Sequence, residues 1–155
     1  MRWLSIDPGA KTGITKWVNG NPVECLTIQT GKVNGERRVQ KIAWEFLQIS
    51  EGYQEAVVEI PGTWTRDGKN VAALMGLSMI VGAIQGVCVA SGIVFRGVPV
   101  AEWKGKGTKA DTKFAVEAEF GPIARNEHER DSVHMGAWWW ASRVVRRHRG
   151  VTINI

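Results

Sequence analysis

Cysteine is scarce in this chain: Cys25 and Cys88 are the only two in 155 residues. Two cysteines so far apart in sequence predict neither a disulfide scaffold nor a cysteine-rich metal site. The first residues also lack a basic segment followed by an apolar stretch of signal length, so nothing predicts secretion. We therefore expect reduced thiols and a cytoplasmic location.

Low-complexity runs and internal repeats are absent as well, which disfavours disordered and solenoid proteins. The length, together with 44% hydrophobic residues, suits one compact domain over residues 1–155. The chain has 20 Lys and Arg against 15 Asp and Glu, a balance that favours a polyanionic partner. The basic residues concentrate at 104–113 and 143–149, and either cluster alone is equally compatible with an ordinary solvated surface.

Charged residues are missing from the whole stretch 71–95, which is long enough to span a bilayer. Its glycines and polar side chains lower its hydrophobicity, and its two flanks do not differ clearly in charge. We therefore expect no membrane span. The better interpretation is a helix over 71–91 that is buried on two sides, one against a sheet and one against a second subunit.

Two short apolar runs, 2–7 and 55–60, each end in a Pro-Gly pair and are typical of buried strands. The segment 36–49 between them has its apolar residues at the spacing of one buried helix face. A helix between two strands forms a crossover, so the strands can lie side by side and parallel. Their carboxyl ends would then bring Asp7 and Glu59 together.

The segments 12–18 and 22–30 flank Asn19-Gly20-Asn21 and predict an antiparallel hairpin, because Asn-Gly tolerates the positive φ values of tight turns. A further strand is expected over 93–103. Two helices follow, one opened by Thr108 and Asp111 and running through Glu119, the other opened near Asn126 and running to about Arg147.

His128 and Asp131 lie three residues apart at the start of the last helix, and therefore on one face. If this helix packs across the strand ends, both side chains join Asp7 and Glu59. Each residue alone has an ordinary interpretation, such as a turn former, a salt-bridge partner or a solvated acid. Clustered buried carboxylates, however, are costly unless a cation compensates them, and a divalent ion does so most cheaply.

Two divalent ions about 4 Å apart suit phosphodiester hydrolysis, because they activate water and stabilise the leaving oxygen. We therefore expect a metal-dependent enzyme with Asp7, Glu59, His128 and Asp131 as catalytic and metal-binding residues. His134, three residues beyond Asp131, competes with His128 as the imidazole of the site, and we favour His128.

Four motifs in this order resemble the RuvC-type Holliday junction resolvases of the ribonuclease H-like superfamily: SIDPGAKTGIT, AVVEIPGTW, VPVAEWKGKGTKADTKFAV and HERDSVHMGAWWWA. The resemblance covers about residues 2–143. In that family the positions matching Asp7, Glu59 and Asp131 are metal-binding catalytic carboxylates, and the position matching His128 is Asp or His. Origin in a bacterium or in a phage stays open.

The resemblance implies an α/β chain with the ribonuclease H-like fold, in which helices flank a five-stranded mixed sheet. Three strands form an antiparallel meander and two are parallel. It also implies a homodimer that makes paired symmetric cuts in a four-way DNA junction and leaves 5′-phosphate and 3′-hydroxyl ends. The expected cofactor is Mg²⁺, for which Mn²⁺ substitutes, with two ions in each active site.

The predicted DNA contacts lie in two segments. Phosphate contacts are expected from four lysines near a helix start: Lys104, Lys106, Lys109 and Lys113. In the loop after the second acidic strand, Trp64 is a candidate for stacking on a base, although an ordinary packing role is equally compatible, and Arg66 is a candidate contact beside it.

Three other functions remain open. A sugar-kinase or actin-like ATPase also carries an Asp-x-Gly followed by Thr and Gly, as in residues 7–13, but such proteins enclose their nucleotide between two domains. A nonenzymatic DNA-binding module would be expected to lack one or more of the acids. An endonuclease for forks, flaps or other branched DNA would keep all of them.

Overall fold

A five-stranded mixed sheet forms the centre of the molecule in the computed structural model, which describes residues 1–62, 71–104 and 108–148. The strand order is β3-β2-β1-β4-β5. The strands are β1 (Arg2–Asp7), β2 (Lys11–Val18), β3 (Asn21–Gln29), β4 (Glu55–Ile60) and β5 (Val94–Pro99). The first three pair antiparallel, and β4 and β5 extend the sheet in parallel. The predicted meander with two parallel strands is confirmed.

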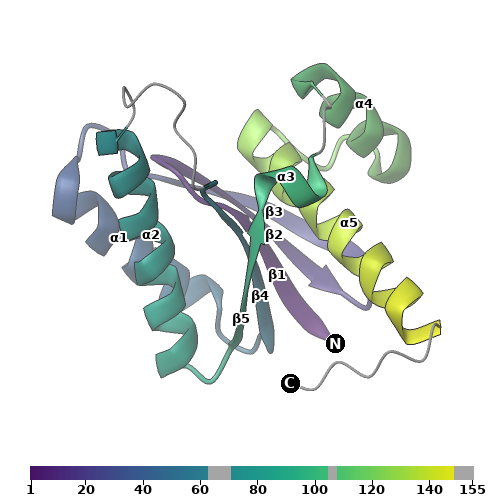
Figure 1. Cartoon of the computed structure of the whole chain (residues 1–155), viewed down its shortest axis with the longest axis horizontal. Coiled ribbons are helices and arrows are strands. Elements are labelled where there is room, and N and C mark those ends of the chain that lie inside the picture. The colour runs from purple at the N-terminus through teal and green to yellow at the C-terminus, as the bar shows by residue number, and fades with distance from the viewer. Residues whose placement is uncertain (63–70, 105–107, 149–155) are drawn as a thin grey trace.

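Helices cover both faces of this sheet (Figure 1). On one face lie α1 (Gly35–Ile49) and α2 (Val71–Ala90), and across the other runs α5 (Glu127–His148). The short α3 (Val100–Trp103) and α4 (Lys109–Phe120) lie beside the first half of α5. The crossover helix between β1 and β4, which places these two strands in parallel, is confirmed.

Strand alternation divides the core into two layers, because successive side chains point to opposite faces. In β1, Leu4 and Ile6 enter an aliphatic layer under α1 and α2, while Trp3 enters an aromatic layer under α5. Trp3 stacks on Trp17 there, with ring centroids 4.8 Å apart. Asp7 has the parity of Trp3 and therefore points toward α5.

The hairpin between β2 and β3 turns at Asn19 and Gly20, whose φ values are 51° and 86°. Positive φ at both central residues is the geometry for which Asn-Gly is favoured. The predicted strand over 93–103 is wrong at its end, since residues 100–103 form α3. The last residue of β4, Ile60, pairs with Pro99, so the chain has no strand partner beyond this point. The helical turn then returns Trp103 to the core, where it is 5% exposed.

One face of α2 is buried and the other is open. Residues such as Ile80 and Ile84 face the sheet, whereas Met75, Met79 and Val89 are 61%, 47% and 73% exposed. By length and composition alone the helix could cross a membrane, with a mean hydropathy of 2.0. The predicted burial of one side of this helix against the sheet is observed. The burial of its other side against a second subunit stays a prediction.

Candidate active site

The first two acidic residues lie at the same edge of the sheet. Asp7 is the last residue of β1, and Glu59 is the next to last residue of β4. The parallel register pairs Ile6 with Val58, so the two carboxylates follow one another across neighbouring strand ends. Because successive side chains of a strand alternate between the two faces, both carboxylates lie on the face of the sheet that α5 covers.

The start of α5 supplies the other two predicted residues. His128 Nδ1 lies 2.9 Å from Asp7 Oδ2, a direct hydrogen bond between residues 121 positions apart in sequence. Asp131, one turn further along α5, accepts a hydrogen bond of 2.6 Å from Lys104 Nζ. The helix therefore does pack across the strand ends as the sequence predicted.

The acids of this edge influence one another electrostatically. Burial raises the pKa of Asp7 to about 6, against the hydrogen bond and charge of His128, and the charge of Asp131 raises it further. Burial raises the pKa of Glu59 to about 7, and the charges of Asp7 and Asp131 add to this effect while Lys104 opposes it. Each ionised carboxylate thus makes the others harder to ionise.

The sequence did not predict the contact of Lys104 with Asp131. Lys104 was expected on a phosphate-binding surface, but its ammonium lies among the acids, with a side chain only 20% exposed. It follows β5 directly after α3, and β5 is parallel to β4, so its strand ends at the same edge as Asp7 and Glu59. The parallel arrangement of β4 and β5 is the feature that would have predicted the position of Lys104 near these acids.

The donor set fits a hard divalent cation, because Mg²⁺ and Mn²⁺ prefer carboxylate oxygens and Mn²⁺ also accepts imidazole. Within the described parts of the chain, no three His, Cys, Asp or Glu side chains converge closely enough to form a ready metal site. Asp131 Oδ2 instead accepts a hydrogen bond from the Lys104 ammonium.

His134 lies apart from the Asp7 contact. Its ring packs edge-on against Trp103 at 5.5 Å between centroids, and its buried Nδ1 has no hydrogen-bond partner among the described residues. Burial lowers its pKa, although the charge of Asp131 acts in the opposite direction. Of the two histidines, His128 is the one in contact with a predicted site carboxylate.

The predicted DNA contacts are only partly within the described residues. Lys109 and Lys113 lie on α4, 74% and 56% exposed, and pair with Glu127 and Glu117 at 2.7 and 3.9 Å. Such exposed pairs contribute little energy. Trp64, Arg66 and Lys106 lie outside the described residues.

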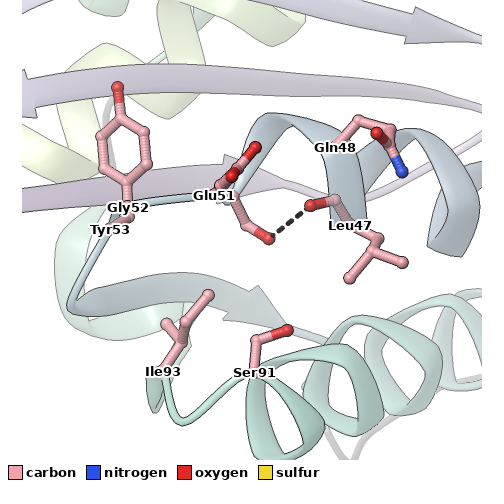
Figure 2. A pocket seen from close by; sticks show the side chains of 8 residues that line it. Leu47, Gln48, Glu51, Gly52, Tyr53, Ser91 and Ile93 are labelled. Carbon is pink, nitrogen blue, oxygen red and sulfur yellow. Dashed lines mark hydrogen bonds between the residues drawn. The ribbon is translucent and has the colours of Figure 1, made fainter.

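A separate pocket lies at the opposite end of the sheet, and Figure 2 shows the residues that line it. It lies between the ends of α1 and α2, where Leu47, Tyr53 and Ile93 contribute to its wall. Tyr53 and Ile93 precede β4 and β5, so the pocket faces the amino ends of these strands. It contains none of the predicted site residues.

The pKa shifts predict how the stability of the metal-free protein depends on pH. Asp7 and Glu59 have ordinary values of 3.8 and 4.5 and folded values near 6 and 7, so the folded state holds protons that the unfolded state has lost. Stability contributed by the neutral carboxyls is therefore complete below pH 4 and is lost as pH rises to about 7.

Thermal unfolding with and without Mn²⁺ measures this effect. We expect Mn²⁺ to raise the melting temperature more at pH 8, where both carboxylates are ionised, than at pH 5. Asp7→Asn should abolish most of that difference. An equal Mn²⁺ effect at both pH values, unchanged in the variant, would contradict the assignment.

Comparisons with known proteins identify the fold. No protein-family model matches the sequence, and no curated protein matches it either. Among solved structures, Thermus thermophilus RuvC is similar with a TM-score of 0.75 at 17% sequence identity, covering 94% of this chain and 97% of that one. The T. thermophilus RuvC in complex with a Holliday junction substrate gives a TM-score of 0.74 at 17% identity, with coverages of 93% and 96%. The chain therefore has the ribonuclease H-like fold of RuvC over nearly its whole length.

Proposed function

We propose that this protein is a divalent-metal-dependent endonuclease that resolves Holliday junctions by paired symmetric cuts. The observation that carries this proposal is the contact between His128 and Asp7, beside two half-buried acids, Glu59 and Asp131. These residues lie in a fold shared with a protein whose solved structure contains a Holliday junction substrate.

Asp7, Glu59, Asp131 and His128 would hold two Mg²⁺ ions, or Mn²⁺ in their place. When bound, such ions supply Lewis acidity for the attacking water and for the leaving oxygen. Asp7 would contribute a carboxylate ligand from the end of β1, which pairs with β4 and lies under the start of α5. His128 orients the Asp7 carboxylate through its 2.9 Å hydrogen bond. The expected products carry 5′-phosphate and 3′-hydroxyl ends.

DNA would approach along α4 toward the strand ends. The N-terminus of α4 is closed by a reciprocal capping box between Thr108 and Asp111. Lys109 and Lys113 extend from the exposed side of this helix and would hold phosphates. Lys106, Trp64 and Arg66 stay predicted contacts to the same DNA.

We further propose a homodimer through the open face of α2. Five exposed residues repeat at spacings of four and three along this face: Met75, Met79, Gly82, Gly86 and Val89. This is the spacing of a helix seam that packs against another helix. A second subunit on this face, rather than lipid, fits a cytoplasmic protein, and two related sites would fit the two-fold symmetry of a junction.

The dimer can be tested at glycines whose replacement the single chain tolerates. A Cβ added to Gly82 or Gly86 meets no atom within 4 Å, so Gly82→Leu should leave the fold intact. We expect it to convert the dimer to a monomer at micromolar concentration, measured by sedimentation. Gly76→Leu is the matched control, since its Cβ also meets nothing but lies outside the open face. A wild-type monomer, or a dimer that survives Gly82→Leu, would reject this interface.

A second candidate keeps the chemistry and changes the substrate to forks, flaps or three-way junctions. The test is incubation of the purified protein with four-way, three-way and linear duplex DNA, with and without Mg²⁺. The proposal expects Mg²⁺-dependent cutting of the four-way junction at paired symmetric positions. Equal cutting of every branched substrate would favour the second candidate, and binding without cutting would favour a nonenzymatic module.

A further inference from the structure

The start of α5 rests on a row of three residues that crosses the sheet. The antiparallel registers pair Asp7 of β1 with Gly13 of β2, and Gly13 with Thr27 of β3. The three residues therefore stand in one line on the face under α5. Above this line lie two consecutive residues of the helix, His128 and Glu129.

The two side chains of this dipeptide reach opposite ends of the row. His128 Nδ1 contacts Asp7 Oδ2 at 2.9 Å, and Thr27 Oγ1 donates a hydrogen bond of 2.7 Å to Glu129 Oε1. The peptide bond between His128 and Glu129 lies over the middle member. A Cβ on Gly13 would overlap the carbonyl group of His128 and would lie only 2.9 Å from the amide nitrogen of Glu129.

The side chain of Glu129 is fully buried, and its carboxylate accepts several hydrogen bonds. Its carboxylate accepts hydrogen bonds from the backbone nitrogen of Arg125 at 2.7 Å and from the guanidinium of Arg125 at 3.0 Å. Its own backbone nitrogen donates to Asn126 Oδ1 at 3.1 Å. Asn126 Nδ2 in turn donates to Thr27 Oγ1 at 2.8 Å. This many hydrogen bonds compensate the burial of the carboxylate and also fix the position of the Glu129 backbone.

We infer that Gly13, Thr27 and Glu129 are positioning residues that set the His128 imidazole against Asp7. Glu129 anchors one end of the dipeptide on β3, Gly13 sets the height of the peptide bond above the sheet, and His128 meets Asp7 at the other end. This inference rests on the proposed function for its effect on cleavage, but the geometric claim stands apart from it.

Gly13→Ala tests whether Gly13 sets the distance between the sheet and the peptide bond that joins His128 to Glu129. The added methyl group would lie 2.1 Å from the His128 carbonyl oxygen, so this peptide must rise by about 1.4 Å to reach an ordinary contact distance of about 3.5 Å. A displacement of that size at a reacting centre can lower a rate about 100-fold. We expect that loss in the single-turnover cleavage rate, while junction affinity measured without divalent metal stays within about threefold.

Thr27→Val tests the anchor by removing one hydroxyl at nearly constant volume, with an expected loss of about tenfold. Gly97→Ala is the control, because it adds the same methyl group to another strand glycine, where the nearest atom is a movable side-chain carbon of Ile60 at 3.0 Å. A loss in Gly97→Ala equal to that in Gly13→Ala would show a general packing effect and overturn the inference.

The ring nitrogen resonances of His128 provide a readout that does not need cleavage. In the wild type, the Nδ1 signal should report the hydrogen bond to Asp7, and Gly13→Ala should remove that signature while the protein stays folded. An unchanged His128 signal in Gly13→Ala would overturn the inference even if cleavage fell. If the wild type cuts no branched DNA, the proposed function fails, and this spectrum still decides the geometric claim.

Discussion

Asp7→Asn is expected to lower junction cleavage by on the order of 1000-fold, which corresponds to about 4 kcal/mol of transition-state stabilisation. Asp7 is the carboxylate in contact with His128 and within the electrostatic influence of Asp131 and Lys104. The amide keeps the shape and can still accept a hydrogen bond from the imidazole. It cannot supply the negative charge that a divalent cation requires.

The same substitution should stabilise the metal-free protein. Burial holds the pKa of Asp7 near 6, about two units above its ordinary value of 3.8, so at pH 8 the ionised group costs up to about 3 kcal/mol. Replacement by a neutral amide removes this cost, and the melting temperature should rise by several degrees. Lost cleavage with a raised melting temperature separates a missing charge from a damaged fold. Cleavage within tenfold of wild type would contradict the role of Asp7.

His128→Ala is expected to reduce cleavage about 100-fold, while His134→Ala reduces it less than about fivefold. His128 contacts Asp7 directly, whereas His134 packs against Trp103 and forms no hydrogen bond through Nδ1 among the described residues. Both substitutions remove an imidazole from the first half of α5, so each controls for the other.

Single-turnover rates on the four-way junction, with junction affinity measured in parallel, distinguish the two histidines. The melting temperature of His134→Ala should fall, since its half-buried ring packs against Trp103, but its rate per folded molecule should hold. If only His134→Ala stops cutting, the imidazole of the site has been assigned to the wrong residue.

The topology followed from local patterns in the sequence. Two buried strands ending in Pro-Gly, a hairpin at Asn19-Gly20 and a crossover helix leave few ways to build a sheet. The same patterns place Asp7 and Glu59 at one edge, because the carboxyl ends of neighbouring parallel strands coincide. The end of β5 was less predictable, because nothing local shows that β4 ends at Ile60 and leaves residues 100–103 without a partner.

Side-chain partners depended on tertiary structure. The convergence of His128 and Asp131 on the strand ends followed from helix periodicity, but the direct contact with Asp7 depends on Gly13, which admits the α5 backbone. Lys104 illustrates the same limit: its place in a basic run suggested a surface, and only the position of β5 beside β4 directs it into the acids. Local charge patterns do not reveal such a pairing.

Asp7, Glu59, His128 and Asp131 are proposed to hold divalent metal at one edge of the sheet, and anomalous diffraction from a crystal soaked in Mn²⁺ can locate that metal. We expect manganese peaks bounded by these four side chains, with Lys104 Nζ moved away from Asp131, and no such peaks in Asp7→Asn. A crystal soaked in Mn²⁺ that shows no peak there, with Lys104 still bound to Asp131, would refute this metal site.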